Sequence, residues 1–166
     1  MENPFENTEA QPKTPTFLVV ICVLTFIGSG WGILADLFNI ATYNTANINI
    51  QINEMTNMSS DLPQNDIFMK EFFNSSIETM KLTALHGKDI AVINLILNIM
   101  NIVGAIMMLR LRRHGFFIYT ASQIMSLFVM PYFAGFSGLI LAGMVGNAIL
   151  AAIFIVMYAM NLKHMH

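Results

Sequence analysis

Residues 89–114 read DIAVINLILNIMNIVGAIMMLRLRRH, an apolar run that ends in the densest basic cluster of the chain. Its apolar part, residues 90–109, is about 20 residues long, and a helix of that length crosses a hydrocarbon core of about 30 Å. These residues are therefore predicted to form a membrane-spanning helix. Arg110, Arg112 and Arg113 follow at once, and because basic side chains resist translocation, they mark the cytoplasmic end of this helix.

The composition of the whole chain is typical of a membrane protein. Of its 166 residues, 55% are hydrophobic and only 11% are charged, whereas soluble domains carry about 25% charged residues. The net charge of −2 is too small to attract nucleic acid, so no nucleic-acid partner is expected. Cys22 is the single cysteine, which excludes a disulfide within the chain.

Three further apolar runs have the length of membrane helices, and a very short loop at 135–138 makes the last two antiparallel neighbours. We predict an all-α polytopic membrane protein, an antiparallel bundle of four transmembrane helices with an extracytoplasmic helical hairpin between spans one and two. An even number of spans places both termini in the cytoplasm. The predicted segments are a flexible cytoplasmic tail (1–15), the first span (16–38), the hairpin (39–88), the second span (89–109), a basic cytoplasmic loop (110–115), the third span (116–134), the fourth span (139–160) and a cytoplasmic end (161–166).

The secondary structure of the predicted hairpin has two readings in its first half. Residues 41–58 fit a helical stripe, yet Ile48, Ile50 and Ile52 alternate with polar residues as in a strand. We favour the helix. Pro63 breaks the pattern before a second, clearer helical face. The hairpin would pack on itself, on the bilayer surface or on a partner.

Polar side chains recur at helical spacing within the spans. Asn94, Asn98 and Asn101 share one helix face, and an unpaired amide in hydrocarbon costs about 2 to 7 kcal/mol, so this face must meet the bundle interior or a wet cavity. We favour a ladder of interhelical hydrogen bonds over a ligand pathway or a subunit contact. The polar residues of the third span are expected to be the hydrogen-bond partners of the three asparagines. The candidate polar core or pathway comprises Asn94, Asn98, Asn101, Tyr119, Ser122, Gln123, Ser126 and Asn147.

Small residues line faces of the first and last spans, where they let another helix backbone come close. We favour packing within one bundle over contact with another copy. The candidate packing interface comprises Gly28, Ser29, Gly32, Gly138, Ala142 and Gly146.

Charged side chains stand at the two ends of the spans. Arg110, Arg112, Arg113 and Lys163 are the candidates for setting orientation and meeting lipid headgroups. Asp36 and Asp89 lie at the outer ends of the first two spans; we favour hydrated carboxylates there over a proton or cation site.

No phosphate-binding loop, zinc motif, paired cysteines or nucleophile elbow occurs in the sequence, so no catalytic centre, cofactor or metal is expected. The stretches NPFENTEAQPKTPTFLVVICVLTFIGSGWGI (3–33), HGFFIYTASQI (114–124) and IVMYAMNLKHM (155–165) resemble uncharacterised four-span inner-membrane proteins of Bacteroidota such as flavobacteria. This resemblance implies a bacterial cytoplasmic membrane and a periplasmic hairpin.

The expected function is therefore non-catalytic. We expect a small integral membrane protein that serves as an accessory subunit or scaffold of a larger inner-membrane complex, contacting partners through its glycine-rich faces and its hairpin. Its expected partners are the lipid bilayer and other membrane subunits or a second copy. The alternative is a small transporter or channel with a polar route lined by Asn and Gln side chains.

Overall fold

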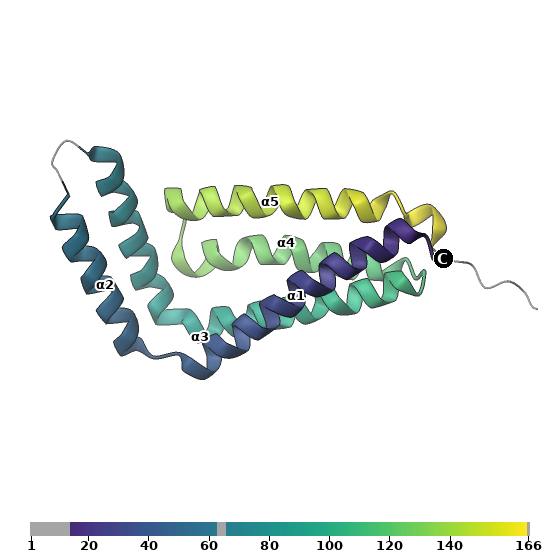
Figure 1. Ribbon diagram of the computed structural model, residues 1–166, viewed down its shortest axis with the longest axis horizontal. Coiled ribbons are helices and arrows are strands. Elements are labelled where there is room, and N and C mark those ends of the chain that lie inside the picture. The colour runs from purple at the N-terminus through teal and green to yellow at the C-terminus, as the bar shows by residue number, and fades with distance from the viewer. Residues whose placement is uncertain (1–13, 63–65, 166) are drawn as a thin grey trace, which may run out of the picture.

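The computed structural model describes residues 14–62 and 66–165, and this part of the chain is helical without any strand (Figure 1). The all-α prediction is confirmed, and of the two readings of residues 41–58 the helix is the correct one. The predicted tail lies almost wholly outside the described residues, as does Pro63. The elements are α1 (Thr16–Thr42), α2 (Thr45–Ser60), α3 (Ile67–Leu109), α4 (His114–Ala134), α5 (Gly138–Ala159) and the short 3-10 helix η1 (Leu162–His164).

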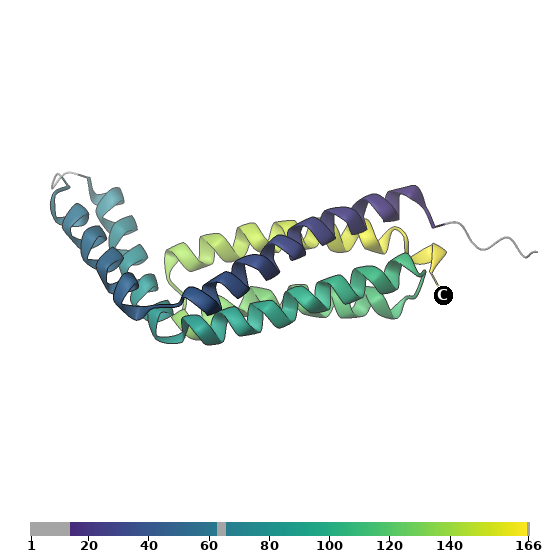
Figure 2. The same cartoon turned by 60° about the horizontal axis from the view of Figure 1, so that its bottom comes forward.

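Four of the helices, α1, α3, α4 and α5, are long and apolar enough to cross a membrane, which indicates a multi-pass membrane protein. Figures 1 and 2 show these four helices extending along the long axis of the molecule. α3 is the central element, because it contacts both α1 and α4 as well as α2, whereas α5 packs mainly on α4.

The helix α3 is longer than the sequence predicted. Its 43 residues join the predicted second helix of the hairpin to the span at 89–109, because only Gly87 interrupts the helix formers between them, and one glycine does not end a helix. In Figures 1 and 2 the first part of α3 lies beside α2, at an angle to the rest of the molecule, and the second part lies beside α1.

The ends of the other spans also differ slightly from the prediction. α1 continues to Thr42, and α4 begins at His114 within the predicted basic loop. Pro131 was expected to kink or end the third span, but α4 continues to Ala134 and ends at Gly135. Gly135 has φ 73°, a conformation that other residues rarely adopt, so the glycine ends this helix.

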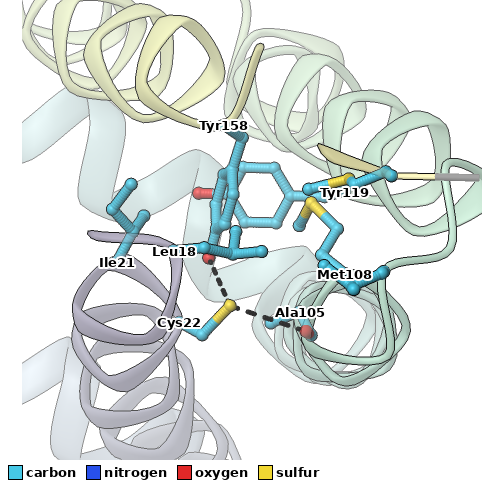
Figure 3. Close-up of a cluster of buried hydrophobic side chains, with 9 residues drawn as sticks. Leu18, Ile21, Cys22, Ala105, Met108, Tyr119 and Tyr158 are labelled. Carbon is cyan, nitrogen blue, oxygen red and sulfur yellow. Dashed lines mark hydrogen bonds between the residues drawn. The ribbon is translucent and has the colours of Figure 1, made fainter. Parts of the chain in front are cut away.

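A tightly packed core closes one end of the bundle (Figure 3). At this end α1 begins and α3 ends. The Tyr158 hydroxyl donates to Cys22 Sγ over 3.7 Å, and Cys22 Sγ donates to the Ala105 carbonyl over 3.6 Å. Sulfur therefore links α1 to both α5 and α3. The buried residues of this core are Leu18, Ile21, Cys22, Ala105, Met108, Leu111, Tyr119, Tyr158 and Met165.

The segment after α5 belongs to this core. Met165 is only 1% exposed, and Arg113 Nε donates to its carbonyl oxygen over 2.8 Å. The predicted cytoplasmic end at 161–166 therefore folds back against the turn between α3 and α4 as far as it is described.

The backbones of α3 and α4 touch at two glycines near this end. A Cβ placed on Gly104 would lie 2.9 Å from the carbonyl oxygen of Gly115 and 3.0 Å from Tyr119 Cβ. Both neighbours are rigid, because one is backbone and the other is the base of a buried side chain. Glycine is needed here for close approach.

Gly104→Ala should therefore destabilise the protein by about 1 to 3 kcal/mol, the usual cost of overpacking. Thermal unfolding in a mild detergent measures the change. Gly143→Ala is the control, since a Cβ at Gly143 meets nothing within 4 Å and alanine is the better helix former by up to about 1 kcal/mol. Equal melting temperatures for the two variants would contradict the close contact.

Candidate functional site

A cavity of about 370 Å³ lies among α1, α3, α4 and α5. All the predicted polar candidates line it except Ser122, which lies directly behind Asn101. Thr25 and Ser29 of α1 also line the cavity. Thr25 was missed as a candidate and Ser29 was predicted only as part of the packing interface, although their four-residue spacing places them on one helix face. Apolar side chains form the rest of the wall: Leu24, Leu97, Met130, Leu150 and Phe154.

Asn101 is held by two side chains of α4. The Ser122 hydroxyl donates a short hydrogen bond to Asn101 Oδ1, and Gln123 Nε2 donates to the same oxygen over 3.4 Å. The expected pairing between the asparagines and the third span is thus confirmed for Asn101. Both Asn101 and Ser122 are buried, so this is an interhelical hydrogen bond inside the protein.

Asn98 has a different partner from the one expected. Its Nδ2 donates to Asp36 Oδ2 of α1 over 2.9 Å. Gly32 makes room for this contact, because a Cβ at that position would lie 2.7 Å from Asn98 Nδ2. The small residue in α1 thus lets an amide of α3 reach a carboxylate one turn further along α1.

The two outer carboxylates lie in different surroundings. Asp36 is 8% exposed, so it is buried against α3 and not free at the end of its helix as we had favoured. Asp89 is exposed, with 68% of its side chain accessible, and lies 3.7 Å from His86 Nδ1. Only Asp36 therefore belongs to the polar interior.

A second cavity, of about 500 Å³, lies where α1, α2 and α3 meet. Asn94 lines both cavities, and Asp36 lines the second while bonded to Asn98, which lines the first. The asparagine face of α3 therefore connects two polar spaces.

The small residues of the predicted packing interface face the interior of the bundle on α1, whereas those on α5 are exposed. On α1, Gly32 contacts Asn98, Ser29 is buried and Gly28 borders the first cavity. On α5 the expected contact with neighbouring helices is wrong within this chain, because Cβ atoms at Gly138 and Gly146 would meet nothing within 4 Å. Ala142 is exposed, and so is Asn147, which was expected to be buried. Tyr158 anchors the far end of α5 in the packed core, whereas most residues of its first half are exposed, with Ile140 as the buried exception.

The predicted orientation residues gather at the tightly packed end. Arg110, Arg112, Arg113 and Lys163 are all exposed there, near the end of the chain marked in Figure 1.

The first cavity offers hydrogen-bonding groups without charge. Amides and hydroxyls line it, and no charged residue does. Across residues 14–62 and 66–165, no group of three His, Cys, Asp or Glu side chains is placed to hold a metal ion. Such a lining can donate and accept hydrogen bonds and is electrically neutral.

A double-mutant cycle should show the energetic link between α3 and α4. Asn101→Ala and Ser122→Ala should be coupled by about 0.6 kcal/mol, and by at most about 1.7 kcal/mol, as for other hydrogen bonds between membrane helices. Reversible unfolding in mixed micelles measures each variant. The exposed Asn49 of α2 gives the control, since Asn49→Ala and Ser122→Ala should add independently. Additive effects for Asn101 and Ser122 would contradict the assigned bond.

The chain was compared with models of protein families, with curated proteins and with solved structures. None of the three comparisons found a match.

Proposed function

We propose that this multi-pass membrane protein is a non-catalytic accessory subunit or scaffold that binds a transmembrane helix of a larger membrane complex. The observation that carries the proposal is the uncovered first half of α5. Cβ atoms at Gly138, Gly143 and Gly146 would meet nothing within 4 Å. Membrane helices use such small residues to bring two backbones close together.

Asn147 lies one turn beyond Gly143, and its amide, which also borders the first cavity, is exposed and adds a polar group to this face. An amide that faces hydrocarbon is costly unless a partner bonds to it, whereas a partner helix with its own polar side chain gains a hydrogen bond. The face thus combines room for a backbone with a group that selects the partner. A helix of another subunit fits both features, and a second copy of this chain is the other occupant to be tested.

The proposed topology is an antiparallel four-span bundle with both termini in the cytoplasm and with α2 and the first part of α3 forming a hairpin outside. The exposed Arg110, Arg112 and Arg113 support this orientation, since Lys and Arg near span ends favour the cytoplasmic side. A bacterial inner membrane, with the hairpin in the periplasm, is part of this proposal, as the resemblance of three sequence stretches to Bacteroidota proteins implies.

Gly146→Ile should remove the partner from the purified protein, because the new side chain occupies the space that the partner backbone needs. The measurement is purification from native membranes in a mild detergent, followed by mass spectrometry and the mass of the particle. Gly30→Ile of α1 is the matched control, since its Cβ also meets nothing within 4 Å. A wild-type particle that contains one copy and no other protein would overturn the proposal.

A second candidate function is a small transporter or channel for neutral polar solutes. The observation that favours it is the pair of polar cavities that share Asn94 in their linings. Amide and hydroxyl groups along such a route replace the hydrogen bonds that a solute loses when it leaves water. The tightly packed core of Figure 3 would then act as the closed inner gate.

Urea is a suitable neutral probe for this route. In an inward urea gradient, liposomes first shrink and then regain volume as urea enters. Proteoliposomes with the wild-type protein should regain their volume faster than protein-free liposomes, as followed by stopped-flow light scattering. Asn94→Leu should return the rate to that of empty liposomes, whereas Asn49→Leu on the exposed face of α2 should leave it unchanged. Equal rates with and without the wild-type protein would exclude this function for urea-sized solutes.

A further inference from the structure

The cavity among α1, α2 and α3 has the composition of a binding site for a cation. Asp36 is the only charged residue among its lining side chains. Amide and hydroxyl groups supply further hydrogen-bond acceptors around this carboxylate. The polar residues of the lining are Asp36, Asn39, Thr42, Tyr43, Asn44, Asn47, Gln51, Thr83 and Asn94.

The charge of Asp36 has no counterpart in the protein as far as it is described. Its Oδ2 accepts one hydrogen bond from Asn98. The only ion pair found within residues 14–62 and 66–165 joins His86 and Asp89, so no Lys, Arg or His nitrogen lies within 4 Å of Asp36. A carboxylate that is removed from water and left unpaired is strongly unfavourable, and carboxylates within membrane spans usually have a cationic partner.

The size of the cavity points to an organic cation. Its volume of about 500 Å³ is much larger than the roughly 30 Å³ that one water occupies, and it falls in the range of small-molecule sites. Phe38, Ile48 and Ile90 give the wall apolar surface for an alkyl group. A divalent metal would require several acidic ligands, and only one is present.

The charge around the cavity favours a cation over an anion. Residues 39–89 contain six acidic side chains and three lysines, which gives a net charge of −3 with histidine neutral. Lys88 Nζ lies 5.8 Å from the ring centroid of Tyr43, a residue that lines the cavity. This contact shows that the Tyr43 ring can accept an ammonium group, since aromatic rings attract cations. Lys88 is at the same time a positive charge that competes with a bound cation.

We propose that this cavity binds a primary ammonium group on a short alkyl chain, with Asp36 as the charged partner. The ammonium belongs either to a free amine or to the ethanolamine headgroup of a lipid, and the chemistry at Asp36 is the same for both. Asn98 positions the carboxylate through its hydrogen bond, and Gly32 provides the space for Asn98. The site is independent of whether the protein serves as a subunit or as a transporter.

The test uses n-butylammonium chloride as the probe and thermal unfolding of the full chain in a non-ionic detergent as the readout. At saturating concentration the probe should raise the melting temperature by about 2 to 4 °C, since a ligand that binds only the folded state stabilises it. Butan-1-ol, which has the same chain without the charge, and sodium chloride at equal concentration should have no such effect. An equal shift with either compound, or no shift with butylammonium, would overturn the proposal.

Two variants assign the effect to Asp36. Asp36→Asn should abolish the shift, whereas Asp89→Asn, which removes an exposed carboxylate of the same region, should keep it. Lys88→Gln should give the same shift at a lower probe concentration, because the competing charge is gone. This variant keeps the proposal testable if Asp36→Asn does not fold, and an unchanged or weaker response of a folded Lys88→Gln would count against the site.

Adding phosphatidylethanolamine to the micelles distinguishes the two sources of the ammonium. If the lipid headgroup is the ligand, this lipid should stabilise the wild type but not Asp36→Asn, and butylammonium should have no further effect. If a free amine is the ligand, phosphatidylethanolamine should act like phosphatidylcholine and the butylammonium shift should persist. Stabilisation of Asp36→Asn by phosphatidylethanolamine or by butylammonium would overturn the role of the carboxylate.

Discussion

The structure depends on partners for two of the three amides that the second span carries into hydrocarbon, where an unpaired polar group costs several kcal/mol; the third, Asn94, borders both cavities. Asn98 bonds to Asp36 of α1, and Asn101 bonds to Ser122 of α4. These two bonds, three residues apart on α3, hold that helix between its two main neighbours. Glycines make both contacts possible, with Gly32 beside Asn98 and Gly104 against α4.

The two ends of the bundle differ in a way that bears on function. At one end Tyr158, Cys22 and the returning Met165 close the space among the helices with buried side chains. Toward the other end a smaller apolar cluster of Ile90, Leu97 and Val129 lies beside the polar cavities. The proposed contact with another subunit and the proposed cation site both lie toward this second end.

Hydropathy alone predicted four helices long and apolar enough to cross a membrane, because an apolar run of membrane length has few alternatives, but it did not predict that α3 continues into the hairpin. The pairing of Asn98 with Asp36 was not predictable, since helical spacing gives the face on which a residue lies but not the neighbour that the face meets. The same limit applies to α5, where a row of small residues predicts close packing with another helix but does not identify that helix. Met165 was missed for another reason: a few polar residues at a chain end carry no periodic pattern, so their return to the core depends on Arg113 and the shape of the turn.

The central claim is that the asparagine face of α3 borders water-accessible space inside a membrane protein. Single-cysteine labelling in intact membranes, in a Cys22→Ser background, tests it most directly with a hydrophilic maleimide. Ile96 is 53% exposed on the outside of the same helix, where lipid should cover it. We predict that Asn94→Cys reacts and Ile96→Cys does not. Labelling of Ile96→Cys together with no labelling of Asn94→Cys would contradict both the membrane location and the polar cavity.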